Sequence, residues 1–285
     1  MDFRAVDHAQ RCRLLEDETA RVASWLRSRT TGELDAPAVG DWSIREVVAH
    51  LVVVADFYAG NVERGALGDS AAPPGRPPAG SMRGASAAAG VLAGAAATAA
   101  ATSEDPLGAF EQSAKRLNAQ LTGLNQDQLD LPGYHPGGLL PLNRFLLLRA
   151  KELCVHEWDM RAPNDASPRI SELGVAAVLR MIDENIASGS LRWAYLPDAG
   201  VAEPLHVGVE LDDPVRWSAA FTVTADSIDM HNNARTPDAT ITGDAEAFVR
   251  VVYGRLDPDI AVENGALSFD PPDLAGRFGR WFNGI

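Results

Sequence analysis

The stretch Arg149–Arg161 (RAKELCVHEWDMR) directly follows an apolar run and is typical of the C-terminal part of a helix. On a helix each residue turns by about 100°. With Glu152 at zero, His156 lies at about 40° and Asp159 at about 340°. Arg149 lies at about 60° by the same arithmetic. Four ionisable side chains therefore share one narrow face that continues into apolar residues, and such buried charges persist only when paired, hydrogen-bonded or bound to a metal.

The spacing Glu152-x3-His156 places two good metal ligands one helical turn apart. Helix bundles complete such sites with a ligand from a facing helix, and His50, on an otherwise apolar helical stripe, is the candidate. Two His and one Glu with an open fourth position is a composition of catalytic zinc sites. A satisfied core histidine and a solvated Glu–His pair remain the alternative interpretation. Cys154, at about 200° on the same helix, faces away and is read as a packed thiol.

Composition limits the class of protein. The chain has 285 residues, 46% of them hydrophobic, which is enough for one large domain or two ordinary ones. A net charge of −14 argues against nucleic acid or an anionic membrane as the main partner. The two cysteines are far apart, and the first ten residues lack the apolar core of a signal peptide. A cytoplasmic protein, monomeric or homodimeric, is therefore expected.

The first half of the chain predicts four amphipathic helices. Hydrophobic periodicity places them at 4–29, 43–63, 104–124 and 141–161, with loops at 33–41 and 125–138. Ser43 and Glu46 form a capping-box pattern at the start of the second helix. Residues 65–103 are rich in Pro, Gly and Ala and predict a long connection. A four-helix bundle with one long crossover, occupying residues 1–165, follows from this order.

The second half, residues 166–285, predicts a small α+β domain. A helix over 170–187 precedes strands, of which Trp217–Thr224 has the clearest alternation of apolar and polar residues. Residues 260–269 are interpreted as strand-like around a Glu263-Asn264-Gly265 turn. Pro271 opens a final helix. The fold class is therefore all-α followed by α+β.

Two motifs resemble a known family. The segments Trp42–Leu51 (WSIREVVAHL) and Glu152–Arg161 (ELCVHEWDMR) are similar to the second-helix and fourth-helix signatures of mycothiol-dependent maleylpyruvate isomerases. Members of that family have a DinB/YfiT-like metal-binding bundle. The C-terminal half resembles the sterol-carrier-like domain that often follows it, through Gly243-Asp244, Tyr253-Gly254-Arg255 and the turn at 263–267. The insertion at 65–103 is longer than is usual in the family.

The resemblance implies zinc, or another divalent metal, on His50, Glu152 and His156, with mycothiol as the thiol cosubstrate. Asp159 would orient a ligand, and Arg255 is the match to a catalytic arginine of the second domain. His135, on the loop before the fourth helix, is a weaker candidate for a metal ligand or a substrate contact, and His135 and Arg149 are the candidate residues for binding the cosubstrate. While no metal is bound, Arg149 is expected to pair with Glu152 or Asp159.

The expected activity is addition of the thiol to an electrophilic, carboxylated small molecule, giving either cis–trans isomerisation or an S-conjugate. The metal ligands do not separate an isomerase from a thiol S-transferase, because both reactions begin with the same addition. Two other classes stay open: a non-enzymatic module that binds a small molecule or lipid, and a metal- or redox-responsive regulatory protein. A hydrophobic cavity in the second domain without metal in the first would favour the binding module.

Overall fold

The computed structural model describes residues 7–81, 94–102, 104–187, 200–230 and 236–281. The described chain packs as two units, one built from residues up to Ala177 and one from Val178 onward. The division falls inside α6 (Glu172–Ala187). All-α structure followed by α+β structure is observed, as the sequence predicts. Among the described helices, none combines the length and the low polarity that crossing a bilayer requires.

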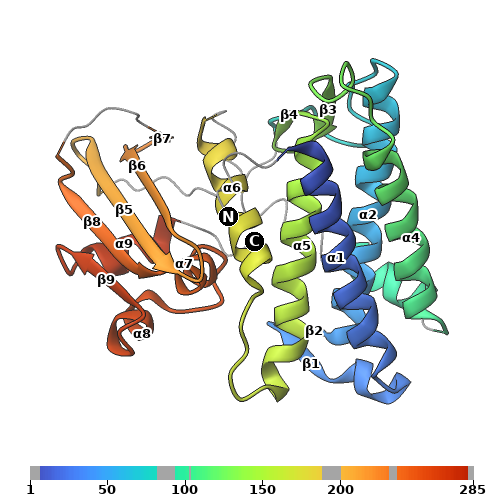
Figure 1. Cartoon of the computed structure of the whole chain (residues 1–285), viewed down its shortest axis with the longest axis horizontal. Helices are drawn as coiled ribbons and strands as arrows, with labels where there is room; N and C mark the ends of the chain where they lie inside the picture. The colour runs from blue at the N-terminus through green and yellow to red at the C-terminus, as the bar shows by residue number, and fades with distance from the viewer. Residues whose placement is uncertain (1–6, 82–93, 103, 188–199, 231–235, 282–285) are drawn as a thin grey trace. The chain divides into compact units, whose positions relative to one another are not determined.

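The first unit is a four-helix bundle of α1 (His8–Arg27), α2 (Ile44–Ala66), α4 (Pro106–Thr122) and α5 (Arg144–Arg161). Figure 1 shows these helices running side by side. Both α1 and α2 pack against α4 and against α5, so each helix touches two neighbours. The helices α1, α2 and α4 each begin at a side-chain cap, because Asp7, Ser43 and Asp105 accept from backbone N–H groups of the first turn. The capping box of Ser43 and Glu46 is present as predicted.

Two β-hairpins replace segments that the sequence predicts as loops. The 3-10 helix η2 (Thr31–Asp35) leads into β1 (Pro37–Val39), which pairs with β2 (Trp42–Ser43). The strands β3 (Pro132–His135) and β4 (Gly138–Pro141) pair antiparallel, so α5 begins at Arg144 rather than near Pro141.

The hairpin β3–β4 packs closely on the end of α2. A Cβ atom added to Gly65 would lie 2.7 Å from Leu142, and one added to Gly133 would lie 2.7 Å from the same side chain. Glycine at these two positions lets the hairpin reach the helix.

The long connection between α2 and α4 is only partly described. The predicted insertion over 65–103 includes residues 82–93 and 103, which lie outside the described residues. Residues 94–101 are helical, in agreement with their alanine-rich composition. Residues 71–81 contact the hairpin β3–β4, since the hydroxyl of Tyr134 donates to the Pro77 carbonyl at 2.7 Å.

The second unit contains a five-stranded mixed sheet in the order β7-β6-β5-β8-β9. The strands are β5 (Leu205–Asp213), β6 (Trp217–Val223), β7 (Ile228–Met230), β8 (Ala239–Asp244) and β9 (Leu267–Asp270). The pair β5–β8 is parallel and the other pairs are antiparallel. Alternate residues of β5 are buried, which is the pattern of a sheet covered on one face.

Helices complete the second unit: the C-terminal part of α6, α7 (Ala245–Val252), α8 (Pro258–Glu263) and α9 (Leu274–Trp281). The aromatic rings of Trp217, Phe248, Phe269, Phe278 and Trp281 form one cluster between the sheet and the helices. The strand predicted over 260–269 is wrong in its first half. Asp257 caps a short helix there, since its carboxylate accepts from the N–H groups of Asp259 and Ile260, and pairing begins only at Leu267.

Candidate metal centre

Three buried side chains meet between α2 and α5. The ligand atoms of His50, Glu152 and His156 all lie within 4.8 Å of one another. Glu152 Oε2 is 3.1 Å from His50 Nε2 and 3.3 Å from His156 Nε2. His50 lies about two turns after the capped start of α2 and faces α5, where it contacts Glu152. The three residues that the sequence predicts as metal ligands are therefore brought together.

Asp159 stands behind one of these histidines. Its Oδ2 accepts from His156 Nδ1–H at 2.8 Å, and its side chain is fully buried. A carboxylate on the far nitrogen fixes the tautomer and turns Nε2 toward Glu152. Burial disfavours the charged imidazole, but the hydrogen bonds to Asp159 and Glu152 outweigh it and raise the pKa of His156.

The electrostatics of the other two groups also suit a cation. Burial lowers the pKa of His50, so this imidazole is neutral at neutral pH with a lone pair to offer. Burial alone would raise the pKa of Glu152, yet Lys151 and the two histidines hold it well below its usual range. One carboxylate and two imidazoles, converging at hydrogen-bond distance, make a donor set that fits a divalent metal such as zinc. A metal ion would take the place of the protons shared between Oε2 and the two imidazoles.

Two neighbours of the cluster are not singled out as site residues by the sequence. The ring of Trp42 lies 5.2 Å from the ring of His50 and 6.3 Å from that of His156, so it covers the cluster from β2. The ammonium group of Lys151 contacts Glu152 Oε1. Trp42 is read from the sequence only as an apolar residue before the cap. Lys151 gives no periodicity signal, since it lies about 100° from Glu152 on the helix.

Arg149 does not form the expected ion pair with Glu152 or Asp159. Its Nη1 donates to the Leu51 carbonyl at 2.7 Å, and its guanidinium lies 5.9 Å from the Phe110 ring. The side chain is 0% exposed, and burial lowers its pKa to about 10. It ties α5 to α2 and α4 inside the bundle, and the contact predicted between Arg149 and a bound cosubstrate stays a prediction.

The remaining candidate residues lie outside the cluster of three. His135 ends β3, and its Nδ1 accepts from the Gly137 N–H at 3.1 Å. Burial, followed by the charge of Lys151, lowers the pKa of His135 to about 4, so the ring is neutral. Arg255 lies in the second unit, where its Nη1 donates to the Tyr253 carbonyl at 2.6 Å. The roles predicted for His135 and Arg255 stay predictions.

Cys154 faces away from the cluster, as the helical arithmetic predicts. Its thiol donates to the Lys151 carbonyl at 3.5 Å, and burial raises its pKa well above the usual range. A Cβ atom added to Gly174 would lie 2.7 Å from Cys154 Cβ, so this side of α5 is in close contact with the start of α6. Cys154 is a packed thiol in this structure.

The chain is similar to known proteins both in sequence and in fold. Residues 15–161 match the sequence profile of the mycothiol maleylpyruvate isomerase N-terminal domain. The fold is similar to the crystal structure of a mycothiol-dependent maleylpyruvate isomerase, with a TM-score of 0.63 and 14% identity over 95% of this chain and 96% of that one. A mutant of that isomerase with one histidine replaced by alanine gives a TM-score of 0.64 over the same shares of the chains, at 14% identity. Comparison with curated protein sequences gives no match.

Proposed function

Because the chain belongs to the mycothiol maleylpyruvate isomerase family, we propose that it is a zinc-dependent enzyme that activates mycothiol for addition to an electrophilic small molecule. The observation that carries the proposal is the buried cluster of His50, Glu152 and His156, which lies within the matched residues. The proposal includes a small-molecule substrate and a low-molecular-weight thiol as partners.

Each residue of the centre has a separate proposed role. His50, Glu152 and His156 would hold the metal, which when bound deprotonates a thiol at neutral pH and so supplies the nucleophilic thiolate. Asp159 keeps Nε2 of His156 turned toward the site. The ring of Trp42 lies near both imidazole rings and is proposed to limit the access of water to them. Arg255 is proposed to hold a substrate carboxylate or to stabilise the enolate that addition creates.

Two outcomes share the first step. The thiolate adds to a conjugated cis double bond, and the electron pair moves onto the neighbouring carbonyl oxygen as an enolate. Rotation about the new single bond and expulsion of the thiolate give the trans isomer and return the thiol. Protonation of the enolate carbon instead gives an S-conjugate, which is the product of a transferase.

The test uses zinc-loaded protein with maleylpyruvate and mycothiol, with fumarylpyruvate followed by chromatography. We expect isomerisation by the wild-type protein and by Glu157→Gln, and none by Glu152→Gln. Adduct formation with another electrophile, without isomerisation of maleylpyruvate, would assign the protein to the transferases. Absence of both reactions, or full activity of Glu152→Gln, would overturn the proposal.

A further inference from the structure

The two carboxylate oxygens of Glu152 have different surroundings. Oε2 faces the imidazoles of His50 and His156 at 3.1 and 3.3 Å. Oε1 contacts the ammonium group of Lys151, the residue immediately before it on α5. Both side chains of this pair are nearly buried, with 12% of Lys151 and 10% of Glu152 exposed. One oxygen is therefore turned toward the ligand cluster while the other is held at its edge.

The choice of lysine at this position is informative because the chain uses arginine almost everywhere else. Of its 25 basic residues, two are lysines, Lys115 and Lys151. Lys115 is exposed on α4. The planar guanidinium of arginine engages both oxygens of a carboxylate at once, whereas the lysine ammonium is a compact charge that can hold one. A lysine beside a ligating carboxylate thus leaves the second oxygen available to a metal.

We propose that Lys151 is a positioning residue of the metal centre, which holds Glu152 Oε1 so that Oε2 alone is presented between His50 and His156. The inference rests on the proposed function, since it assumes that these three residues bind a metal. A carboxylate held in this way ligates through one oxygen. The coordination position that a second oxygen would fill then stays open for the sulfur of a thiol.

The two ligands contributed by α5 are alike in that each has a neighbouring side chain that orients it. His156 is oriented by Asp159, three residues further along the helix, and Glu152 is oriented by Lys151, its direct neighbour. Each ligand thus has one atom turned to the cluster and a second atom held by a charged side chain of the same helix. Partners of this kind outside the ligand set typically change metal affinity by about 10- to 100-fold when removed.

A positioning role and a mere charge effect predict opposite results. A cation beside a divalent metal repels it, so removal of the charge alone would raise the affinity for the metal. Loss of positioning lowers that affinity, because Glu152 is then free to turn and Oε2 is no longer held between the two imidazoles. The sign of the change in affinity therefore decides between the two.

The experiment compares the wild-type chain with Lys151→Met, Lys151→Arg and, as the matched control, Lys115→Met. Affinities for Zn²⁺ and Co²⁺ are measured by competition with a chelator, and the visible absorption of the Co²⁺ form reports the coordination number. We expect Lys151→Met to bind about 10- to 100-fold more weakly and to lose the intense bands of four-coordinate cobalt as a second oxygen enters. Lys151→Arg should also bind more weakly, since its fork draws on both oxygens, and Lys115→Met should match wild type.

Unchanged or tighter metal binding by Lys151→Met, with an unchanged cobalt spectrum, would overturn the inference and leave the proposed function standing. Weaker binding by Lys151→Met together with wild-type affinity in Lys151→Arg would overturn the argument from the choice of lysine, because either cation would then hold Oε1 equally well. If the wild-type protein itself binds neither metal, the proposed function fails and the inference fails with it. Circular dichroism of each variant shows whether it is folded, and Lys151→Arg keeps the charge should the methionine variant not fold.

Discussion

Two faces of α5 bury carboxylates that have different partners, and they are called here the histidine face (Glu152, His156 and Asp159) and the arginine face (Glu157 and Arg161). On the face toward α2, Glu152 meets His50 and His156, and Asp159 meets His156. On the opposite face, Glu157 meets arginines. One helix thus carries buried acids with titratable partners and a buried acid with permanently charged partners.

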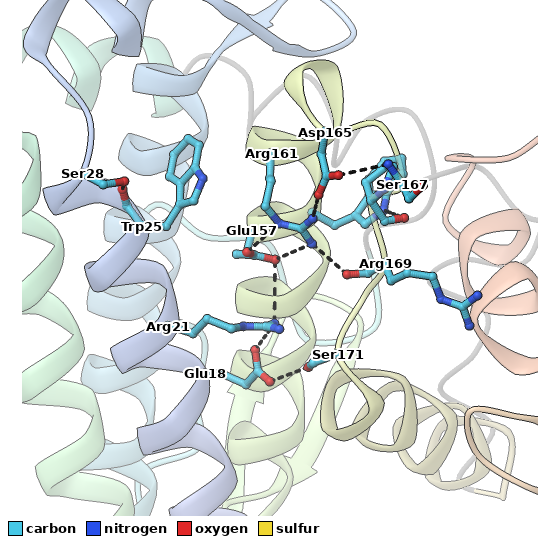
Figure 2. Close-up of polar contacts among 12 residues, drawn as sticks. Glu18, Arg21, Trp25, Ser28, Glu157, Arg161, Asp165, Ser167, Arg169 and Ser171 are labelled. Carbon is cyan, nitrogen blue, oxygen red and sulfur yellow. Dashed lines mark hydrogen bonds and ion pairs between the residues drawn. The ribbon is translucent and has the colours of Figure 1, made fainter.

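The arginine face forms a continuous network, shown in Figure 2. Arg161 Nε donates to Glu157 Oε1 at 3.0 Å, and Arg21 Nη2 lies 3.8 Å from Glu157 Oε2. Arg21 also pairs with Glu18 of α1, which accepts from Ser171 Oγ at 2.7 Å. Arg161 further pairs with Asp165 and donates to the Arg169 carbonyl, beyond the end of α5. This face joins α1, α5 and the segment leading to α6.

The two faces differ in whether the partners of the carboxylate can release a proton. An arginine stays charged at any working pH, and Arg161 donates to both carboxylate oxygens of Glu157, so neither oxygen is left for a metal. An imidazole can give up a proton, and the carboxylate beside it then needs another cation. Both faces therefore contain a buried glutamate, but Glu157 takes part in a structural ion-pair network and Glu152 in a candidate metal site.

The largest expected effect comes from replacing one glutamate on each face by glutamine and comparing the two variants. Glu152→Gln keeps the shape of the side chain but removes the anionic ligand. We expect loss of bound zinc by elemental analysis and a fall in thiol-dependent activity of at least about a thousandfold, because a catalytic metal contributes several kcal/mol. Glu157→Gln is the matched control and should keep its zinc. Equal zinc content in both variants would remove the distinction between the faces.

A break in the arginine network should change stability and leave the metal unaffected. Arg161→Met leaves Glu157 buried with its principal partner gone, which typically costs about 3 to 5 kcal/mol. The low end is expected, about 3 kcal/mol, because 23% of the Arg161 side chain is exposed and Arg21 remains nearby. Urea unfolding measures the loss, and chelator competition should give the wild-type zinc affinity. A drop in zinc affinity without a drop in stability would contradict the comparison.

Asp159→Asn tests the histidine face without touching a ligand. The amide can accept from His156 Nδ1–H but no longer carries the charge that stabilises the orientation of the ring. We expect zinc affinity to fall about 10- to 100-fold, with the fold retained. Isothermal titration calorimetry on the metal-free protein measures the change. Unaltered affinity would mean that Asp159 only fills space in the bundle.

Much of this centre follows from sequence because helical spacing is rigid. The i, i+4 spacing of Glu152 and His156 fixes their common face, and the capping box at Ser43 fixes where α2 starts and so where His50 points. The same arithmetic excludes Cys154. The repetition of hydrophobic residues every 3.6 positions also predicts the four helices of the bundle. The predicted boundaries are wrong by a few residues where a hairpin precedes a helix, as at the start of α5.

The errors fall where local pattern gives no information on tertiary contacts. Arg149 shares the face of Glu152 by angle, but its long side chain reaches past that face to the Leu51 carbonyl. The hairpin β3–β4 is too short to show a period, and it packs closely on α2 at Gly65. Lys151 is missed because a lysine side chain can bend around the helix to a neighbour that its backbone position does not face.

The capping box gives a smaller test, because His50 depends on the start of α2. Ser43 accepts from the Glu46 N–H, and Glu46 in turn accepts from the Ser43 N–H at 2.8 Å. Ser43→Ala should lower the free energy of unfolding by about 1 kcal/mol. Zinc affinity should fall by less than in Asp159→Asn, since the remaining turns of α2 keep their register. Thermal unfolding and chelator competition on the same samples give both numbers, and a larger loss of affinity than of stability would place the cap in the site itself.

The smallest effect concerns the pH dependence of the arginine face. Burial raises the pKa of Glu18, and its hydrogen bonds with Arg21 and Ser171 only partly offset this. The folded protein then binds more protons than the unfolded chain above the ordinary value of 4.5, so this group lowers stability as the pH rises through that window. Glu18→Gln cannot ionise, and we expect it to be equal to wild type or more stable by less than about 1 kcal/mol at pH 7. That advantage should disappear below pH 4.5, where the wild-type residue is protonated in both states. Urea unfolding of both proteins from pH 8 to pH 4 measures it, and an advantage that grows toward acid pH would mean that the Glu18 charge stabilises the network.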